Sequence, residues 1–349
     1  MRPEPLRIEP IFSPRIWGAH SLAPLFPEKS NVAEPLGEAW LTGTHCKIVS
    51  GLFEGQTLET AWRAMSVEWK GTQLAFTESF PILVKFIFPN DQLSIQVHPD
   101  DDYAAARERA AGGRGKTEMW HAVSAEPDAR VFIGLKPSVD KTRFLRGIEQ
   151  HDLLDLFQAH AVHTGDTFFV PAGTPHTIGP GATLCEVQEY SDITYRVYDF
   201  GRLDTSGKPR ELHLEKALEV IKFGDCGGGK IPRLALPANK MRKSLLAACR
   251  FFATERWEIA TSCEVQMDPA HFDAAAVLTG NGVFHWSSGS TSYRAGECWL
   301  LPATLGPFSI QPHEPTTLIR TYVPDLPALR MQLKAHGHTE QALAKVVFV

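Results

Sequence analysis

The chain has 349 residues, of which 43% are hydrophobic and 21% are charged, as in an ordinary globular protein of about two domains. Its net charge of -5 supplies no basic surface of the kind that binds nucleic acid, so we expect no nucleic-acid partner. No apolar run is long enough to span a bilayer and the first residues lack a signal-peptide core, so we expect no membrane partner and a cytoplasmic location. The six cysteines form no C-x-x-C pair, which favours reduced thiols over disulfides or a cysteine-ligated zinc.

The first two thirds of the chain alternate short strands with helical segments. Apolar residues from Leu58 to Trp69 recur at helical spacing and predict a helix over residues 58–70, which Gly71 ends. Further helical segments are predicted over residues 99–111, 138–160 and 211–222. Strands are predicted over residues 8–17, 48–53, 81–88, 93–98, 116–121, 128–134, 162–170, 182–187 and 193–199.

The last third of the chain has a different pattern. Residues 224–232 concentrate glycine just after a predicted helix, so they are the best candidate for a linker. From Phe251 onward, short strands alternate with turns, as in a β-sandwich or barrel. Residues 165–172, GDTFFVPA, resemble residues 296–303, GECWLLPA, but only the first copy continues to a histidine. The sequence therefore predicts two related β modules, one with a polar site and one without.

We place the boundary between these modules at the glycine-rich segment. The first predicted domain covers residues 1–229, carries the metal site, and contains helical insertions at about residues 58–70, 138–160 and 211–222. The second predicted domain covers residues 230–349 and is a smaller β module without metal ligands.

Residues 93–99, LSIQVHP, place polar side chains on one face of a predicted strand. Ser94, Gln96 and His98 share that face, because side chains in a strand repeat every two residues. The apolar run at residues 81–88 predicts a neighbouring strand that is buried on both faces. Unpaired polar groups are costly in such a place. The polar row therefore either lines a metal or ligand pocket or consists of hydrogen-bonded core side chains.

Other segments supply side chains that could join this polar row. Lys116 and Glu118 lie two residues apart, His176 follows a turn of glycine and proline, and Glu186 and Arg196 lie on successive predicted strands. Two histidines, one carboxylate and one amide oxygen form a nitrogen and oxygen site that suits zinc and also accepts iron, manganese, cobalt or nickel. A single carboxylate leaves such a divalent site with net positive charge, which favours polarisation of substrate oxygens. Hydrogen-bonded core residues are again the alternative.

The segment from Gly165 to His176 has the pattern Gly-x5-Pro-x-Gly-x2-His, which is a motif of the cupin superfamily. Together with further segments in the same order, it resembles the type I mannose-6-phosphate isomerase family in its short bacterial form. Those segments are WG at 17–18, GEAW at 37–40, QVHPD at 96–100, GKTEMW at 115–120 and SDITYR at 191–196. The resemblance covers most of residues 17–202, and the C-terminal part resembles only a degenerate cupin.

The resemblance implies a mainly β fold, with a cupin jelly-roll barrel that has helical insertions and a second, degenerate cupin-like module. It implies a metal-dependent aldose–ketose isomerase that interconverts mannose 6-phosphate and fructose 6-phosphate through a cis-enediolate. A sugar phosphate is then the small-molecule partner, and one Zn2+ per chain, or another divalent metal, is the cofactor. The family's metal ligands correspond to Gln96, His98, Glu118 and His176. Its catalytic residues correspond to Lys116 and Arg196, and its substrate-binding residues to Trp17, Glu38, Lys85 and Glu186.

Some features of the site differ from the family pattern or leave alternatives open. Gln96 stands where other cupins have a histidine, as it does in the isomerase family, and Thr177 follows His176 where longer members have an aromatic residue. Lys85, in an apolar strand, either faces the pocket or pairs with a core carboxylate. Lys116, Glu186 and a metal-bound water all remain candidates for the base. The alternative functions are an iron-dependent cupin oxygenase and a non-catalytic sugar-binding cupin, although lysine and arginine in the site suit a phosphate and an enediolate.

Overall fold

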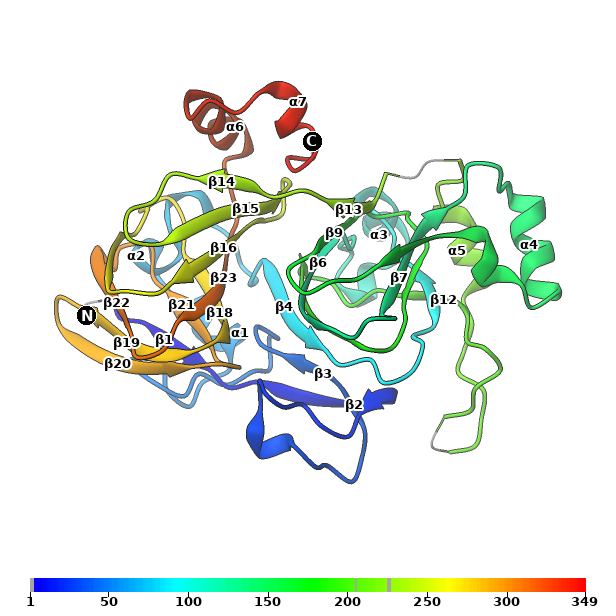
Figure 1. Cartoon of the computed structure of the whole chain (residues 1–349), viewed down its shortest axis with the longest axis horizontal. Helices are drawn as coiled ribbons and strands as arrows, with labels where there is room; N and C mark the ends of the chain where they lie inside the picture. Colours follow the sequence, from blue (N-terminus) through cyan, green and yellow to red (C-terminus); the bar gives the residue numbers. More distant parts are fainter. Residues whose placement is uncertain (1–2, 205, 225–226) are drawn as a thin grey trace.

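The computed structural model describes residues 3–204, 206–224 and 227–349. The described residues form two β modules that lie side by side (Figure 1). All strand pairs within the four sheets of these residues are antiparallel, so the prediction of a mainly β fold is confirmed. No helix among the described residues is long and apolar enough to cross a membrane.

The first module combines a seven-stranded sheet with a five-stranded sheet. The seven-stranded sheet has the order β13 (Gly229–Ile231), β9 (Thr167–Val170), β6 (Glu118–Ala125), β11 (Ala182–Glu189), β4 (Ile82–Ile87), β3 (Leu36–Trp40) and β2 (Ile11–Ala19). The five-stranded sheet has the order β12 (Tyr195–Tyr198), β5 (Ile95–Val97), β10 (His176–Ile178), β7 (Arg130–Leu135) and β8 (Phe157–Ala161). Alternate side chains of both sheets, such as Trp120, Ile133 and Phe168, share one apolar cluster.

The second module combines a seven-stranded sheet with a four-stranded sheet. The larger sheet has the order β1 (Leu6–Ile8), β21 (Cys298–Leu301), β18 (Asp273–Thr279), β23 (Thr316–Tyr322), β16 (Ala253–Ile259), β15 (Arg242–Ala248) and β14 (Leu234–Leu236). The smaller sheet has the order β17 (Cys263–Gln266), β22 (Pro307–Pro312), β19 (Asn281–Trp286) and β20 (Gly289–Arg294). Because β1 pairs with β21, the start of the chain completes a sheet of the second module. The boundary at 229/230 remains a prediction, and residues 225 and 226 of the predicted linker lie outside the described residues.

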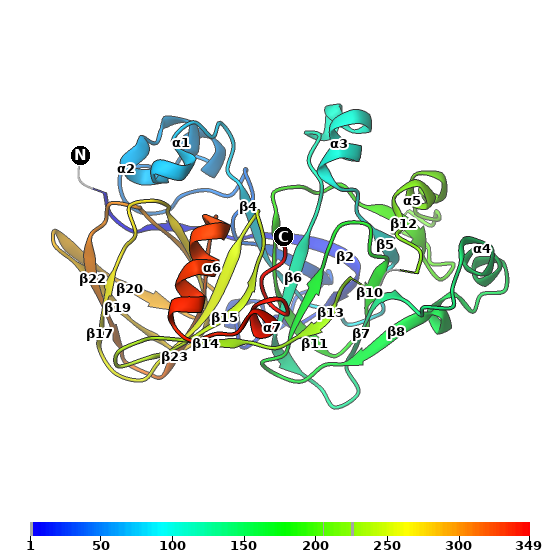
Figure 2. The same cartoon turned by 90° about the horizontal axis from the view of Figure 1, so that it is seen from above.

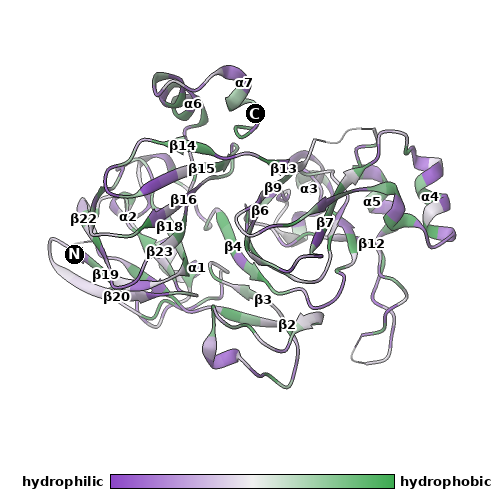
Figure 3. Cartoon of the chain, in the orientation of Figure 1, coloured by the Kyte–Doolittle hydropathy of each residue, from purple (hydrophilic) through white to green (hydrophobic). Residues whose placement is uncertain are grey.

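The two modules share an apolar core. The side chains of Val84, Phe86 and Val187 from the first module belong to the same buried cluster as Leu300 and Ile319 from the second. Burial of one large apolar side chain stabilises a fold by about 1.5–3 kcal/mol, so this shared cluster holds the two sheets together. Figure 3 shows the contrast between the hydrophobic strand β4, which is buried throughout, and the mostly hydrophilic helix α4 (Lys141–Glu149) at the edge of the molecule.

The helices are shorter than the apolar spacing predicts. The predicted helix over residues 58–70 is divided, because Met65 has an extended backbone with ψ 134°. The predicted helical segment over residues 138–160 ends at Glu149, His151 has a left-handed φ of 60°, and its last residues form β8 instead. The predicted strand over residues 48–53 has a single bridge residue, Ile48, followed by bends and a turn. The remaining helices are α1 (Leu58–Ala64), α2 (Val67–Lys70), α3 (Asp101–Arg107), α5 (Leu214–Val220), α6 (Leu326–Ala335) and α7 (Glu340–Leu343), with 3-10 turns at Pro27–Lys29, Thr72–Leu74, Arg109–Ala111 and Leu153–Leu156.

Gly71 is the point where the end of α2 contacts the second module. Its φ is +91°, and a Cβ there would lie 2.3 Å from the carbonyl oxygen of Ala270. We expect Gly71→Ala to lower the free energy of unfolding by roughly 2–5 kcal/mol, because backbone strain and overpacking add. Gly55→Ala is the matched control, since Gly55 has a φ of +85° and no atom within 4 Å of the added Cβ. Urea denaturation of both variants checks this, and equal losses would contradict the close contact.

Candidate metal centre and active site

Three buried side chains of the first module converge on one point. The ligand atoms of His98, Glu118 and His176 all lie within 4.8 Å of one another, and none of the three residues is more than 1% exposed. Strand pairing produces this convergence, because His176 of β10 lies directly opposite Gln96 of β5 and His98 follows that strand. The structure therefore brings together the residues that the sequence predicts as metal ligands.

Hydrogen bonds fix the orientation of both imidazole rings. Nδ1 of His98 lies 2.9 Å from the carbonyl oxygen of Ile193, and Nδ1 of His176 lies 2.8 Å from that of Thr174. A carbonyl only accepts, so each Nδ1 carries the proton and each Nε2 keeps its lone pair. Burial lowers the pKa of His176 to about 4 and lowers that of His98 well below its ordinary value, so both rings are neutral at neutral pH.

The cluster contains more acceptors than donors. Nε2 of His176 lies 3.2 Å from Oε1 of Glu118, and that buried oxygen has no hydrogen-bond donor among the described residues. Lys116 donates to Oε2 of Glu118 at 2.6 Å and lies 3.2 Å from Nε2 of His98. The amide nitrogen of Gln96 lies 3.2 Å from Nε2 of His176, so rotation of that amide would present its oxygen instead. Convergent acceptors without enough donors fit a bound cation, and imidazole with carboxylate suits a divalent metal.

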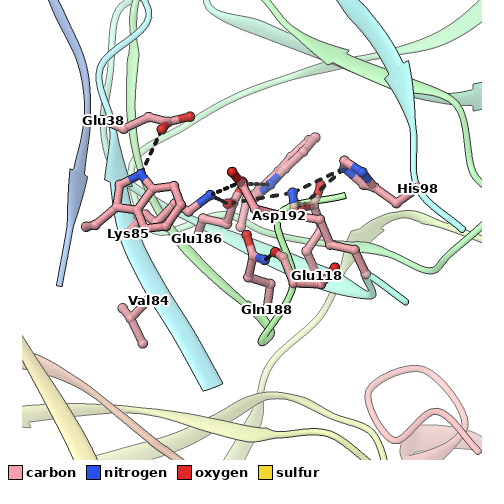
Figure 4. Close-up of polar contacts among 12 residues, drawn as sticks. Glu38, Val84, Lys85, His98, Glu118, Glu186, Gln188 and Asp192 are labelled. Atoms are coloured by element: carbon pink, nitrogen blue, oxygen red, sulfur yellow. Dashed lines mark hydrogen bonds and ion pairs between the residues drawn. The ribbon is translucent and has the colours of Figure 1, made fainter. Parts of the chain in front are cut away.

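A charged row extends from this cluster into the first module. Lys85 lies 3.6 Å from carboxylate oxygens of both Glu186 and Asp192, and Lys116 lies 3.9 Å from Glu186. Trp120 donates from Nε1 to the second oxygen of Glu186 at 3.1 Å. Figure 4 shows the row with its side chains pointing toward one another between the strands. Lys85 therefore both lines the pocket and pairs with a buried carboxylate, Glu186, and with the exposed Asp192, so the two alternatives from the sequence do not exclude each other.

The charges in this row set one another's protonation. Burial raises the pKa of Glu186, and although Lys116 and Lys85 oppose that effect, the pKa stays above its ordinary value. Burial alone would lower the pKa of Lys116, but Glu118 and Glu186 outweigh it and raise that pKa. Lys116 is therefore held as an ammonium group, whereas Glu186 takes up a proton more readily than an exposed carboxylate.

The N-terminal strands supply a second wall. Glu38 accepts hydrogen bonds from Nη2 of Arg15 at 2.7 Å and from Nε1 of Trp40 at 2.8 Å. Burial tends to raise the pKa of Glu38, but Lys85 and Arg15 lower it more, so Glu38 is a carboxylate. Trp17 is buried in the same wall. The structure thus places both Trp17 and Glu38 at the pocket, as the sequence predicts.

These residues surround a cleft of about 460 Å³. Its polar and charged lining residues are Arg15, Glu38, Lys85, Ser94, Gln96, Lys116, Glu186, Asp192, Thr194, Arg196 and Arg210. Among the described lining residues, five are cationic and three are acidic, so the lining has a formal excess of two positive charges. This excess suits a dianionic group such as a phosphate monoester.

Arg196 is the lining arginine with the most donors to spare. Its Nη1 donates to the carbonyl oxygen of Glu211 at 2.8 Å, and its buried Nε has no partner among the described residues. Arg15 is paired with Glu38, and Arg210 is paired through two nitrogens with Asp199. A ligand anion in the cleft would therefore find its readiest donor in Arg196.

Sequence reasoning missed two of these arginines. Arg15 precedes Trp17 by two residues on β2, so alternation along the strand was a signal that could have found it. Arg210 lies between β12 and α5 in a segment without regular structure, and no periodicity or motif identifies it. Its position in the cleft follows only from the folded chain.

The family model and the related proteins that match this chain are all described as mannose-6-phosphate isomerases. Residues 6–125 match the family model described as phosphomannose isomerase type I, catalytic domain. Mannose-6-phosphate isomerase ManA of Bacillus subtilis is 32% identical over 322 residues, which are 89% of this chain and 97% of that protein. Mannose-6-phosphate isomerase of Streptococcus mutans is 33% identical over 306 residues, which are 86% of this chain and 93% of that protein.

Solved structures agree with these matches. The crystal structure of mannose 6-phosphate isomerase from Bacillus subtilis has a TM-score of 0.83 and 29% sequence identity, and the match covers 91% of this chain and 99% of that one. A mannose 6-phosphate isomerase crystallised with zinc and yttrium has a TM-score of 0.68 at 16% identity over 91% of this chain and 99% of that one, which is a likeness of fold. The expected cupin architecture is confirmed by the first of these structures.

Removing either histidine of the cluster should remove the metal. We expect His98→Ala and His176→Ala to weaken zinc binding by at least about 100-fold, because even residues that only support a metal ligand contribute 10–100-fold. His121→Asn is the control, since His121 is also buried but hydrogen-bonds to Thr167 at 3.1 Å outside the cluster. Metal content after equilibration in zinc buffers checks this, with circular dichroism to confirm folding. Unchanged metal content in both histidine variants would show that the cluster is not the site.

Proposed function

This chain belongs to the type I mannose-6-phosphate isomerase family, and from that premise we propose how its residues interconvert mannose 6-phosphate and fructose 6-phosphate. The family resemblance of the sequence is thereby confirmed, and an iron oxygenase or a non-catalytic sugar-binding cupin is not favoured. The observation that carries the proposal is the buried cluster of His98, Glu118 and His176 beside two lysines and a cleft with excess positive charge.

We propose that one zinc ion per chain binds to Gln96, His98, Glu118 and His176. Neutral imidazole nitrogens and carboxylate or amide oxygens are ligands that zinc accepts, and other divalent metals accept them as well. When bound, the metal supplies positive charge that polarises the substrate oxygens. The hydrogen bonds of the two Nδ1 atoms support this role, because they direct both Nε2 lone pairs toward the cluster.

Arg196 is proposed to hold the anionic end or the developing enediolate of the substrate. It lines the cleft, its buried Nε has no partner among the described residues, and a guanidinium remains charged at any working pH. Trp17, Glu38 and Lys85 complete the wall and are proposed to bind the sugar. Glu38, held as a carboxylate by Arg15 and Trp40, would accept hydrogen bonds from substrate hydroxyls.

Isomerisation requires that a proton leave C2 and return at C1 while negative charge passes over two vicinal oxygens. We propose that Glu186 moves this proton, because it lines the cleft and burial raises its pKa above that of an exposed carboxylate, which makes it a better proton acceptor. Lys116, held as an ammonium between Glu118 and Glu186, is proposed to stabilise the enediolate oxygens. In this assignment Glu186 transfers the proton and its neighbour Lys116 stabilises the negative charge.

Paired substitutions separate these two tasks. We expect Glu186→Gln to reduce kcat by about 10²–10⁴-fold and to abolish exchange of the C2 proton with solvent, because the amide cannot accept it. Lys116→Met should also reduce kcat but should retain measurable C2 exchange. Glu258→Gln, at a half-buried position of β16 that pairs with Arg242 and does not line the cleft, is the control and should change neither quantity. The reverse pattern, with exchange surviving in Glu186→Gln and lost in Lys116→Met, would assign the base to Lys116.

Metal removal tests the cofactor assignment. Dialysis against a chelator should abolish conversion of mannose 6-phosphate to fructose 6-phosphate, and added zinc should restore it in proportion to the metal bound, up to one ion per chain. Coupled assay of fructose 6-phosphate and metal analysis of the same samples measure both quantities. Full activity of metal-free protein would contradict the proposal.

A further inference from the structure

The strand registers allow positions in the two modules to be matched. In the first module, Glu118 of β6 lies opposite Val170 at the end of β9. In the second module, Asp273 of β18 lies opposite Leu301 at the end of β21. Val170 and Leu301 occupy the same place in the repeated segments GDTFFVPA and GECWLLPA. Asp273 therefore stands where the first module has Glu118.

Further positions follow from the neighbouring strands. Glu186 lies opposite Trp120, two residues after Glu118, and Arg320 lies opposite Ala275, two residues after Asp273. The strands that follow have the same order in both sheets. Lys85 lies opposite Glu186, and Glu255 lies opposite Arg320. Glu38 lies opposite the residue two after Lys85, and Lys243 lies opposite the residue two after Glu255. The matched pairs are Glu118 with Asp273, Glu186 with Arg320, Lys85 with Glu255, and Glu38 with Lys243. The second module thus retains charged residues at these positions, and three of the four have the opposite sign.

His176 of the first module has no metal-binding equivalent in this arrangement. His176 lies six residues after Val170 and opposite Gln96, and Pro307 lies six residues after Leu301 and opposite Gln266. A proline side chain offers no ligand atom. The second module therefore keeps the charges of the active-site end without the imidazole that would complete the same metal site.

Three of the matched residues, Lys243, Glu255 and Arg320, line a cavity of about 380 Å³ between the larger sheet of the second module and helix α6, which lies over that module in Figure 2. Asp273 lies behind them and pairs with Arg320. Arg320 donates to Glu255 at 2.9 Å and to Asp273 at 2.7 Å. Nδ1 of His271 lies 3.2 Å from Asp273. These side chains are at most 14% exposed, although the interior next to them is apolar. Buried ion pairs contribute little net stability, so their presence around a cavity suggests recognition of a ligand.

Lys243 indicates the charge of that ligand. Its ammonium lies 4.1 Å from the ring centroid of Trp257, and no carboxylate oxygen of the described residues lies within 4.0 Å of it. The carboxylates of Asp268 and Asp325 at the same cavity accept backbone hydrogen bonds from Ala270 and Ala328. By formal count the described lining has two cations and three carboxylates, so the site for an anion is local to Lys243 and is not a property of the whole cavity. Glu255 is paired with Arg320, which leaves Lys243 as the lining cation without a close carboxylate, and an anionic group on a ligand would complete its environment.

The remaining polar groups of the lining are suited to bind hydroxyl groups of a ligand. Arg320 has donors left beyond its two ion pairs, and Gln332 of α6 adds an amide that both donates and accepts. Tyr322 provides a flat face against which His271 stacks at 4.1 Å. The cavity is close in size to the cleft of the first module. We propose that this cavity is a second ligand site, separate from the active site, for a small hydroxylated anion of the polyol phosphate class.

Binding of a polyol phosphate to the metal-loaded enzyme tests this site. Glucitol 6-phosphate lacks a carbonyl and cannot be isomerised, so titration calorimetry can count its sites under equilibrium conditions. We expect about two molecules per chain, and we expect Lys243→Met to weaken one site at least about tenfold while kcat and KM are unchanged. Methionine keeps an apolar stem against Trp257, so the fold is preserved. Lys240→Met, at an exposed neighbouring lysine, should leave both sites intact.

Arg196→Ala is the converse test, because it should weaken binding only at the site in the first module and leave the second site intact. Occupancy of a single site in the unaltered enzyme, displaced fully by mannose 6-phosphate, would overturn the proposal. Equal affinity for uncharged glucitol would contradict the anionic requirement, and equal affinity for inorganic phosphate would contradict the need for hydroxyl groups. Because isomerase activity is measured separately, failure of the second site leaves the active-site assignment unaffected.

Discussion

The site depends on a fully buried carboxylate, Glu118, placed between two imidazole nitrogens that can only accept. Nδ1 of each ring is committed to a backbone carbonyl, and burial keeps both rings neutral, so neither histidine neutralises Glu118. Lys116 satisfies one carboxylate oxygen and leaves the other without a donor among the described residues. Lys116 compensates the charge of Glu118, but the second carboxylate oxygen and the two Nε2 lone pairs remain buried acceptors, which a bound cation would satisfy. The metal dependence of the family thus has a direct counterpart in the hydrogen bonds of this chain.

The sheets that present this polar interior are stabilised from their other faces. Residues of β4 alternate between the two environments, because Lys85 and Ile87 face the barrel interior and Val84 and Phe86 face the apolar core shared with the second module. The second module therefore supports the active site without contributing a residue to its cleft among those described. A buried charged row needs such a rigid support, since small displacements would expose or unpair its members.

Local patterns predicted the site better than they predicted the helices. Alternation along one strand was enough to put Gln96 and His98 on the same face. The residues that follow Gly165 indicated a cupin, and the further segments in the same order indicated the family. The helices over residues 58–70 and 138–160 were too long, because apolar spacing does not register an extended Met65 or a left-handed His151. Pairing of β1 with β21 joins residues almost 300 positions apart, and no local pattern specifies it. Arg210 was missed for the same reason.

Strand register reveals equivalent positions in the two modules that the sequence alone does not show. GDTFFVPA and GECWLLPA are recognisably alike, but Lys85 and Glu255 are not, and only the pairing of β4 with β11 and of β16 with β23 shows that they are equivalent. In both modules a cross-strand pair of opposite charges occupies this position, as Lys85 with Glu186 and as Glu255 with Arg320. Reversing both signs preserves the attraction between partners while reversing the charge that each strand offers to a ligand. Both modules therefore have the ion pair at the same place in the sheet, whereas the cluster of two histidines and a carboxylate occurs, among the described residues, only in the first module.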